Sequence, residues 1–499
     1  MRKELLINAT PPETRVALTE DGRVVEVLHE RRGRQGLVGN VYLGRVHRVL
    51  PGMQAAFVSI GLDRDAFLYV EDVEPLPAEF DFGVEIEGTE KPDASESGEP
   101  PRIDDLIKEG EEILVQVTKD PIAGKGPRVT AGISLPGRTM VYLPGAREIG
   151  VSRRVTDEAE RQRLRGILER FDGEGGWIAR TAALGKSEEQ LLPDFRYLTD
   201  LAARISRRRE NAAPPALIHR ELDLALRSVR DLAGDECEVI RVDEEAAHDR
   251  LKQFLQSVAP SLISRLDFHG RSEPLFELYG VEAEIENALR SRVSLPSGGS
   301  LVIHQTEALV AVDINTGKFV GKEGLEETVF ATNLEAVPEV ARQIRLRDLG
   351  GLLVIDFIDM EEPEHRRRLF ERFEQELSKD RARTRILQVS EFGLIEVTRQ
   401  RTRGNLERIL TRACPACAGS GRIKTDLTVA LDLRRALLRP PNLFSAGQTV
   451  QVRVRPGVAR VLMEEDPALL AEVEATLGVR VELEEDETVA APGFEIAKG

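Results

Sequence analysis

Two stretches of sequence, Leu309-Val-Ala-Val-Asp313 and Gly351-Leu-Leu-Val-Ile-Asp356, decide the fold of this chain. Each is a short apolar run rich in branched side chains, which predicts a buried β-strand, and each ends in an aspartate. Helical patterns follow at 323–347 and 363–379, and this alternation of strand and helix is typical of a covered α/β sheet. The sequence therefore predicts two carboxylates at the rim of one sheet, where functional sites gather.

Asp313 and Asp356 are candidates to hold one Mg²⁺, an ion that prefers oxygen ligands and keeps several waters. Such an ion activates a water and stabilises charge on a phosphodiester. Asn315 lies two residues past Asp313 and faces the same side of an extended strand, so it can orient that carboxylate. The alternative role of a strand-end aspartate is a turn or a helix cap. Asp359, ahead of Pro363, fits a helix cap as well as it fits a further ligand.

Two cysteines form a second candidate metal site in the segment Cys414-Pro-Ala-Cys417-Ala-Gly-Ser-Gly421. A C-x-x-C turn followed by glycines is typical of half a zinc knuckle, but tetrahedral zinc needs four ligands. The third cysteine, Cys237, lies in a strand-like stretch and is interpreted as a small buried hydrophobic residue. A second copy of the chain would complete the site with its own pair, which predicts a zinc-bridged dimer. The rival interpretation is a thioredoxin-like redox pair, which requires a β-α-β setting that the sequence does not display.

A small β-barrel is predicted upstream by short β segments separated by glycine and aspartate. These segments comprise 39–50, 54–60, 66–70 and 112–118. Residues 76–104 are rich in Glu, Pro, Gly and Ser and cannot form a core, so we expect an exposed acidic insertion there. Phe57 and Phe67 lie on barrel strands and could stack on bases, although core packing is the commoner role of such residues. Lys119, just past the last strand, could contact phosphate.

The other segments predict mixed α/β structure. Strands are expected at 5–8, 14–18 and 23–30, with a hairpin turn at Asp21-Gly22. Helices are expected at 157–171, 187–210, 217–231 and 281–292, and an α/β piece after 404. The pair Arg180-Thr181 follows a short strand, and an arginine with a neighbouring hydroxyl can bind phosphate.

Charge is distributed unevenly along the chain, which contains 69 lysines and arginines against 86 aspartates and glutamates. The net charge of −17 argues against nucleic-acid binding, because phosphate contacts need cations. Arginine nevertheless concentrates in four runs, which indicate an RNA-facing surface unless they are solvated helix faces. The runs span 342–347, 366–368, 381–385 and 399–403. Three cysteines in 499 residues exclude a disulfide framework and indicate a reducing compartment, and no apolar run reaches the length of a membrane span.

The chain resembles the ribonuclease E/G family, in particular its ribonuclease G branch, over nearly its whole length. The resemblance is carried by Ala311-Val-Asp-Ile-Asn-Thr-Gly-Lys318, Gly350-Gly-Leu-Leu-Val-Ile-Asp-Phe-Ile-Asp-Met360 and the cysteine segment 414–421. The chain ends soon after the catalytic half, without the long tail of ribonuclease E, which favours the ribonuclease G branch.

The resemblance implies an α/β multidomain fold. Its expected parts are an RNase H-like domain split between 1–38 and 215–282, an S1-type OB barrel at 39–128 with the acidic insertion 76–104, a 5′-sensor region at 129–214, a DNase I-like catalytic domain at 283–405, a zinc-link at 406–422 and a small C-terminal α/β domain at 423–499.

The resemblance also implies roles for the candidate residues. These are RNA contact for Phe57, Phe67 and Lys119; recognition of a 5′-monophosphate for Arg180 and Thr181; catalysis for Asp313, Asn315, Asp356 and Arg383, with Mg²⁺ or alternatively Mn²⁺ on the two aspartates; and structural Zn²⁺ shared between protomers for Cys414 and Cys417.

Such a protein would be a cytoplasmic endoribonuclease that hydrolyses A/U-rich single-stranded RNA, leaves 5′-phosphate and 3′-hydroxyl ends and prefers 5′-monophosphorylated substrates. Its expected substrates are messenger RNA and the precursor of 16S ribosomal RNA. It would form a homodimer or homotetramer and have no membrane span. The alternative is a non-catalytic S1-type RNA-binding protein of translation or ribosome assembly, which needs the barrel but no metal.

Overall fold

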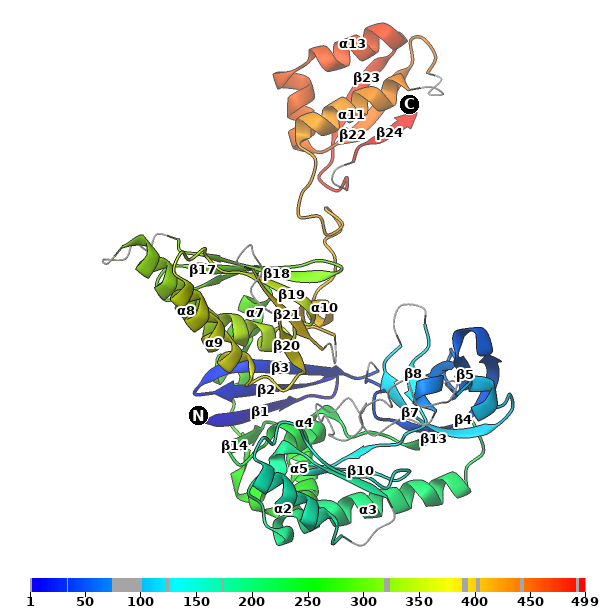
Figure 1. The fold of residues 1–499 in the computed structure, drawn as a ribbon. Helices are drawn as coiled ribbons and strands as arrows, with labels where there is room; N and C mark the ends of the chain where they lie inside the picture. The colour runs from blue at the N-terminus through cyan, green and yellow to red at the C-terminus, as the bar shows by residue number, and fades with distance from the viewer. Residues whose placement is uncertain are drawn as a thin grey trace. The chain divides into compact units, whose positions relative to one another are not determined.

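The computed structural model of the chain describes residues 2–33, 35–73, 101–121, 125–171, 175–317, 324–387, 394–400, 404–439, 444–490 and 493–498. Two compact units make up the chain, Met1–Ile409 and Leu410–Gly499 (Figure 1). No helix in the described stretches is both long and apolar enough to cross a lipid bilayer.

The first sheet of unit 1 joins the N-terminal strands to strands from the middle of the chain. β1 pairs antiparallel with β2 and parallel with β14, in the order β15-β14-β1-β2-β3. The turn between β2 and β3 places Asp21 and Gly22 at φ 49° and 79°, the left-handed conformation of a tight hairpin turn. The two segments predicted to share one split domain therefore lie in one sheet. Its elements are β1 Lys3–Ala9, β2 Glu13–Glu20, β3 Arg23–Arg31, α4 Leu224–Leu232, β14 Cys237–Val242, α5 Glu245–Val258, η5 Pro260–Arg265 and β15 Leu266–Phe268.

The predicted small barrel is confirmed. Strands β4, β5, β6, β8 and β7 pair in that order, and pairing of β4 with β7 closes the ring. Its elements are β4 Val41–Leu50, η1 Pro51–Met53, β5 Ala55–Ser59, β6 Ala66–Tyr69, η2 Val70–Asp72, α1 Ile103–Leu106, β7 Glu112–Lys119 and β8 Arg128–Thr130.

The barrel strand predicted at 112–118 is confirmed as β7, whereas two other predictions near the barrel need correction. The expected exposed insertion 76–104 extends too far, because α1 begins at Ile103 and buries this residue completely in the barrel core. The part of the expected insertion up to residue 100 lies outside the described residues. The helix expected over 217–231 is wrong at its start, where β13, Ala216–His219, pairs antiparallel with β4. Backbone pairing with the first residues of β4, ahead of the stretch of β4 that pairs with β5, decides this segment, and the local pattern does not reveal such a partner.

A third sheet follows the barrel in the order β11-β12-β10-β9. Trp177 of β12 is buried and stacks on Tyr142 of β10 with ring centroids 4.3 Å apart. The buried Asp194 of α3 accepts hydrogen bonds from the backbone amides of Arg138, Thr139 and Met140, and so fixes the turn between β9 and β10. The elements are β9 Leu135–Pro136, β10 Met140–Leu143, β11 Ile149–Val151, α2 Glu158–Leu168, β12 Gly176–Ala179, η4 Thr181–Ala183 and α3 Glu188–Glu210.

The sheet that carries the two strand-end aspartates is mixed, in the order β16-β17-β18-β19-β21-β20. Helices α8 and α9 lie side by side and their apolar residues share one core with the sheet (Figure 1). Strands β18 and β19 turn Val312, Ile314 and Ile355 into this core, so their other residues point to the opposite face. The elements are α6 Leu275–Leu278, α7 Val281–Ala288, β16 Arg292–Ser294, β17 Ser300–Gln305, β18 Leu309–Asn315, α8 Leu325–Leu346, β19 Gly351–Asp356, α9 Pro363–Leu377, β20 Thr384–Ile386, β21 Leu394–Arg399 and α10 Leu406–Leu410.

Unit 2 is a small α/β body with its own apolar core. Its sheet has the order β23-β22-β24, in which β22 and β23 are parallel and connected through helices. The elements are α11 Asp426–Leu438, β22 Thr449–Val454, α12 Pro456–Arg460, η6 Val461–Glu465, α13 Ala468–Leu477, β23 Arg480–Glu485 and β24 Glu495–Lys498.

Truncation of the α9 core should destabilise the mixed sheet. Phe373 is fully buried and packs edge-on against Phe357. We expect Phe373→Ala to lower the free energy of unfolding by about 3–5 kcal/mol, measured by urea denaturation. The matched control is Phe370→Ala on the same helix, where the side chain is only half-buried and the loss should be clearly smaller. Equal losses at the two positions would contradict the assignment of the buried face.

Candidate functional site

The two predicted acidic residues lie side by side. β18 and β19 are parallel neighbours, and the register pairs Asp313 directly with Asp356. Adjacent strands run about 4.8 Å apart, and directly paired residues point to the same face of a sheet. Both side chains are exposed, on the face opposite the core shared with α8 and α9. The structure thus brings two carboxylates together on an open face near the ends of the strands.

Asn315 is the immediate polar partner of this pair. Its Nδ2 donates a hydrogen bond to Oδ2 of Asp313 at 2.7 Å. The spacing of two residues along β18 puts the donor and the acceptor on the same face. The bond restricts rotation of the Asp313 carboxylate, which is what an orienting residue beside a metal ligand does.

Several negatively charged side chains lie close together at this edge of the sheet. Burial and the charges of Asp313 and Asp359 raise the pKa of Asp356 above its ordinary value. The suggestion that Asp359 caps the following helix is wrong, because the N-cap residue of α9 is Glu362. Asp359 instead adds negative charge beside the pair, and a divalent cation would relieve the repulsion.

The donor set fits Mg²⁺ or Mn²⁺, which take carboxylate oxygens and complete their shell with water and substrate oxygens. Among the described residues there is no cluster of three or more acidic, histidine or cysteine side chains suited to a metal ion. Asp313 and Asp356 could hold such an ion as a two-carboxylate site with open coordination positions.

A row of aromatic and basic residues crosses the barrel, and we call it the barrel row. Register pairs Arg48 with Phe57, Phe57 with Phe67, Phe67 with Arg128, and Arg128 with Lys119. The rings of Phe57 and Phe67 meet edge-on with centroids 5.4 Å apart, and both are only half-buried. Arg48 and Lys119 at the two ends are exposed. Such a row can stack bases on the rings and bind phosphates at its ends.

Sequence reasoning missed two members of this surface. Tyr69 is 39% exposed, and its ring lies 4.5 Å from that of Phe67. The guanidinium of Arg128 lies 4.6 Å from the centre of the Tyr69 ring. The available signal was the spacing of two residues between Phe67 and Tyr69, which places them on one face of a strand.

The predicted phosphate-binding pair lies at the end of β12. Arg180 is half-buried, and its Nη1 donates to Gly137 O at 2.5 Å and to Oδ1 of Asp231 at 2.9 Å. Thr181 starts η4 and is exposed. Arginine and hydroxyl are therefore adjacent, and the arginine already has a carboxylate partner.

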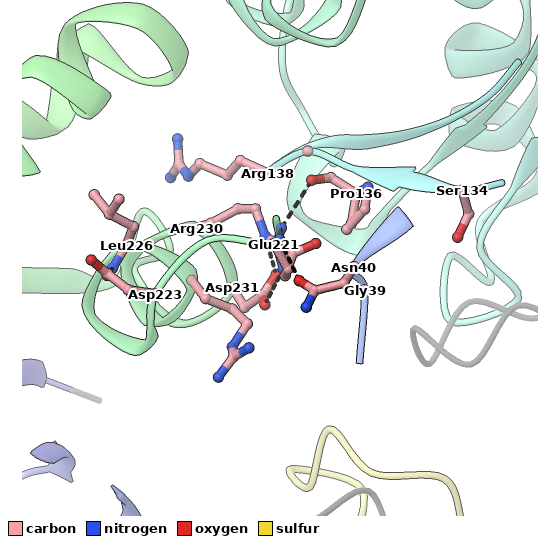
Figure 2. A network of polar contacts seen from close by, with 12 residues as sticks. Gly39, Asn40, Ser134, Pro136, Arg138, Glu221, Asp223, Leu226, Arg230 and Asp231 are labelled. Atoms are coloured by element: carbon pink, nitrogen blue, oxygen red, sulfur yellow. Dashed lines mark hydrogen bonds and ion pairs between the residues drawn. The ribbon is translucent and has the colours of Figure 1, made fainter. Parts of the chain in front are cut away.

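Asp231 belongs to a polar network that joins the third sheet to the barrel (Figure 2). Arg230 is buried and donates to both oxygens of Asp231, to Glu221 at 2.7 Å and to Pro136 O at 3.2 Å. The amide of Glu221 in turn donates to Asn40 Oδ1. Burial raises the pKa of Asp231, but the charges of Arg230 and Arg180 outweigh this and leave that pKa lowered. Asp231 therefore stays ionised and holds Arg180 in place.

Arg383 does not lie beside the acidic pair along the sheet. Its neighbour Thr384 pairs with Arg399, which pairs with Gly351 at the start of β19, whereas Asp356 ends that strand. Five residues of extended strand separate the two levels by about 17 Å. The structure thus brings Asp313, Asn315 and Asp356 together and leaves Arg383 at the other end of the sheet, so its role near the scissile phosphate stays a prediction.

The arginine run 342–347 and Arg399 of the run 399–403 do not form an RNA-facing surface, which corrects that expectation for these residues, while residues 401–403 lie outside the described residues. Arg342 donates to Glu339, Glu284 and Val24 O, and Arg345 forms two bonds with Glu20. Arg399 is buried against Asp380 and Asp348. These arginines sit in partly buried ion pairs, several of which bind α8 to the first sheet, so they are unavailable to phosphates.

The cysteine pair forms a tight turn ahead of α11. Cys414 is exposed and Cys417 half-buried, and Gly419 and Gly421 have φ of 90° and 70°. The backbone amides of Gly421 and Gly419 donate to the Cys417 sulfur and lower the pKa of its thiol. Glycines in left-handed conformation let these amides point at the sulfur. A turn that stabilises a thiolate fits half of a zinc site, and the described residues supply no further ligand.

The prediction that no β-α-β setting is present is wrong for unit 2, since β22 and β23 form one. Cys414 and Cys417, however, precede α11 and follow α10, so they do not sit at the junction of a strand and the helix after it. Unit 2 therefore has the fold that a thioredoxin-like redox pair requires, but the two cysteines do not occupy the position in it that such a pair requires. Cys237 is fully buried in β14, as expected for a small hydrophobic residue.

Comparison with known proteins gives matches along nearly all of the chain. A model of the ribonuclease E/G family matches residues 134–402, and a model described as the RNase E/G thioredoxin-like domain matches residues 413–499. The second match covers the cysteine turn and the sheet of unit 2.

Curated relatives match over similar lengths. Ribonuclease G of Salmonella typhimurium and ribonuclease G of Escherichia coli K12 are each 44% identical over 485 residues, which is 97% of both chains. Ribonuclease E of Haemophilus influenzae is 36% identical over 500 residues, which is 99% of this chain and 52% of that protein.

Replacement of one cysteine should separate the zinc and redox interpretations. If two copies share one zinc, Cys417→Ser should lose the metal, measured by plasma mass spectrometry, and shift toward monomer in sedimentation. Cys237→Ala, which alters a cysteine outside the turn, is the control and should keep both properties. A zinc-free wild-type protein with a reversible bond between Cys414 and Cys417 would instead support the redox pair.

Proposed function

Because the chain belongs to the ribonuclease E/G family, we propose that it is an endoribonuclease that hydrolyses single-stranded RNA at the face carrying Asp313 and Asp356. The observation that supports the proposal most directly is the register of β18 and β19, which sets these two carboxylates side by side. The hydrogen bond from Asn315 to Asp313 adds the orienting contact that such a site needs.

A divalent cation held there would supply an activated water and stabilise negative charge on the phosphate. Asp313 and Asp356 bind and place the ion, and Asn315 keeps the Asp313 carboxylate in one orientation. In the reaction the water oxygen forms a bond to phosphorus while the bond from phosphorus to the 3′ oxygen breaks. The 3′ oxygen takes up a proton, so the products carry a 5′-phosphate and a 3′-hydroxyl.

The barrel row would hold the RNA near this face. Half-buried rings at Phe57 and Phe67 offer stacking to unpaired bases, and Lys119 offers a cation to the backbone. Stacking needs bases that are free of a duplex, which favours A/U-rich single-stranded substrates. Messenger RNA and the 5′ region of the 16S ribosomal RNA precursor are the substrates that this proposal names.

A preference for 5′-monophosphorylated RNA would come from Arg180 and Thr181. The Arg180 guanidinium can turn toward a phosphate while Thr181 adds a hydroxyl donor. Asp231 balances the charge of Arg180 in the absence of RNA, so a phosphate with two negative charges competes best for that arginine. We include in the proposal a homodimer or tetramer linked by zinc at Cys414 and Cys417.

The second candidate is a non-catalytic RNA-binding protein that uses the barrel alone. The exposed row across β5, β6 and β8 is consistent with it. The two candidates differ at the acidic pair, since a binder has no need for repelling carboxylates that a cation must neutralise.

Substitution of one carboxylate should separate cleavage from binding. We expect Asp313→Asn to reduce cleavage of a 5′-monophosphorylated A/U-rich oligomer more than about a hundredfold, and Asn315→Ala about ten- to a hundredfold. Affinity for the same RNA, measured by fluorescence anisotropy with a chelator present, should stay unchanged. The control is Asp249→Asn, an exposed aspartate on α5. Cleavage by Asp313→Asn at the wild-type rate would support the binding-protein alternative.

Loss of the Arg180 side chain should remove the end preference. For Arg180→Ala, the ratio of kcat/KM between 5′-monophosphate and 5′-hydroxyl substrates should fall to about one, with the hydroxyl substrate little affected. Arg180→Lys keeps the charge but not the two-point geometry, and should retain part of the preference. If the wild-type ratio survives in Arg180→Ala, the sensor assignment is wrong.

A further inference from the structure

A cationic hollow lies at the C-terminal end of α3, and its lining includes neither residue of the acidic pair. It has a volume of about 690 Å³ and is lined by Arg204, Arg207, Arg208 and Leu217 among others. Its lining, as far as the described residues define it, contains no carboxylate. We call this feature the α3 hollow.

The arginines of the α3 hollow differ from the arginines that form ion pairs with carboxylates. Arg204, Arg207 and Arg208 are exposed, and no ion pair between described residues includes any of them; the side chains of Arg207 and Arg208 donate to backbone oxygens. By contrast, Arg342, Arg345 and Arg399 are committed to carboxylates. In a chain with net charge −17, three exposed arginines without acidic partners concentrate positive potential at one place.

Backbone contacts hold part of this set in position. Arg208 donates from Nη1 to Ile218 O at 3.1 Å, which ties the helix to β13 across the hollow. Asn211 donates to Arg207 O at 2.8 Å. A guanidinium has five N–H donors, so each arginine keeps several for a ligand. On β13, burial lowers the pKa of His219, the charge of Glu221 raises it, and the charges of Arg208 and Arg204 lower it, so these two arginines act on the neighbouring strand.

The hollow also has an apolar side next to the barrel. Leu217 is 41% exposed, and on β13 it pairs with Tyr42 of β4. The same strand β4 contains Arg48, the first residue of the barrel row. Six residues of extended strand separate Tyr42 from Arg48, a distance of about 20 Å, which a single strand of a few nucleotides spans.

We propose that the α3 hollow binds the phosphate backbone of single-stranded RNA, as a contact site separate from the barrel row and from the acidic pair. Arg204, Arg207 and Arg208 bind phosphate oxygens, and Leu217 contacts an unstacked base or ribose. The hollow then extends the RNA-binding surface of the barrel along β4 and β13. The inference rests on the single-stranded RNA substrate proposed above.

The test measures RNA binding without cleavage, so that it does not depend on the acidic pair. A 5′-hydroxyl, A/U-rich 20-nucleotide RNA is titrated with full-length protein in the presence of a chelator, and anisotropy is recorded over a range of salt concentrations. For Arg204→Gln/Arg207→Gln we expect roughly tenfold weaker binding at 0.1 M salt. The slope of log K against the logarithm of the salt concentration should decrease in magnitude by about 1.4, the value for two phosphate contacts of a single strand. Arg204→Lys/Arg207→Lys should keep the wild-type salt dependence.

Two controls separate a direct contact from a general loss of charge. Arg2→Gln/Arg435→Gln removes the same charge from exposed arginines that pair with carboxylates, and should leave affinity and salt dependence unchanged. A five-nucleotide RNA that fills the barrel row but cannot reach the hollow should bind wild type and Arg204→Gln/Arg207→Gln equally.

Unchanged binding of the long RNA by Arg204→Gln/Arg207→Gln, at an unchanged melting temperature, would overturn the proposal. An equal loss for the short RNA would do so as well, because it would indicate a general electrostatic effect. A wild-type protein that binds in this way but cleaves nothing when Mg²⁺ is added would refute the proposed nuclease activity and leave the α3 hollow intact.

Discussion

The parallel pairing of β18 with β19 forces two negative charges into adjacent positions, and the proposed chemistry depends on that constraint. Directly paired residues share a face, so the Cβ atoms of Asp313 and Asp356 stay next to each other as long as the sheet is intact. Burial and repulsion raise the pKa of Asp356, which means that the fold carries an electrostatic cost at this rim. A structural role would favour a neutral or oppositely charged neighbour. The arrangement is instead suited to a cation that arrives with water and substrate oxygens.

Ion pairs between sheets hold this rim in relation to the rest of unit 1. Arg345 joins α8 to Glu20 of β2, and Arg342 reaches Val24 O of β3. At another junction, Arg381 donates to the backbone oxygen of Asp231, whose carboxylate holds Arg180. The segment before β20 is thereby connected through Asp231 to Arg180. Buried pairs of this kind contribute more to a fixed geometry than to net stability, because burial of each charge costs much of what the pairing returns.

Local patterns were sufficient for the elements whose cause is local. The apolar runs ending in Asp313 and Asp356, the turn at Asp21-Gly22 and the strands of the barrel all follow from residue order and turn chemistry. The strand β13 and the early start of α1 did not, because pairing with β4 and burial of Ile103 in the barrel are decided by distant residues.

The candidate site shows the same division. The bond between Asn315 and Asp313 follows from a spacing of two residues on one strand. The position of Arg383 could not be predicted, because it depends on β20 adding to the far end of β21. Similarly, the sequence shows where the arginines cluster but does not show which acidic residues pair with them in the fold. Glu20 and Glu284, far away in sequence, turn Arg345 and Arg342 into structural residues.

The distribution of arginine partners explains how a chain with net charge −17 can bind RNA at all. Net charge acts at a distance that salt screens within about 8–10 Å, so binding depends on the charges within reach of the phosphates. Acidic residues neutralise Arg342, Arg345 and Arg399 near the mixed sheet. Arg48 and Lys119, at the ends of the row across the barrel, are exposed. The α3 hollow adds three more cations along the same β4–β13 pair of strands. The barrel residues and the α3 hollow therefore supply exposed positive charge at two places joined by β4 and β13, which can bind phosphates in spite of the negative net charge.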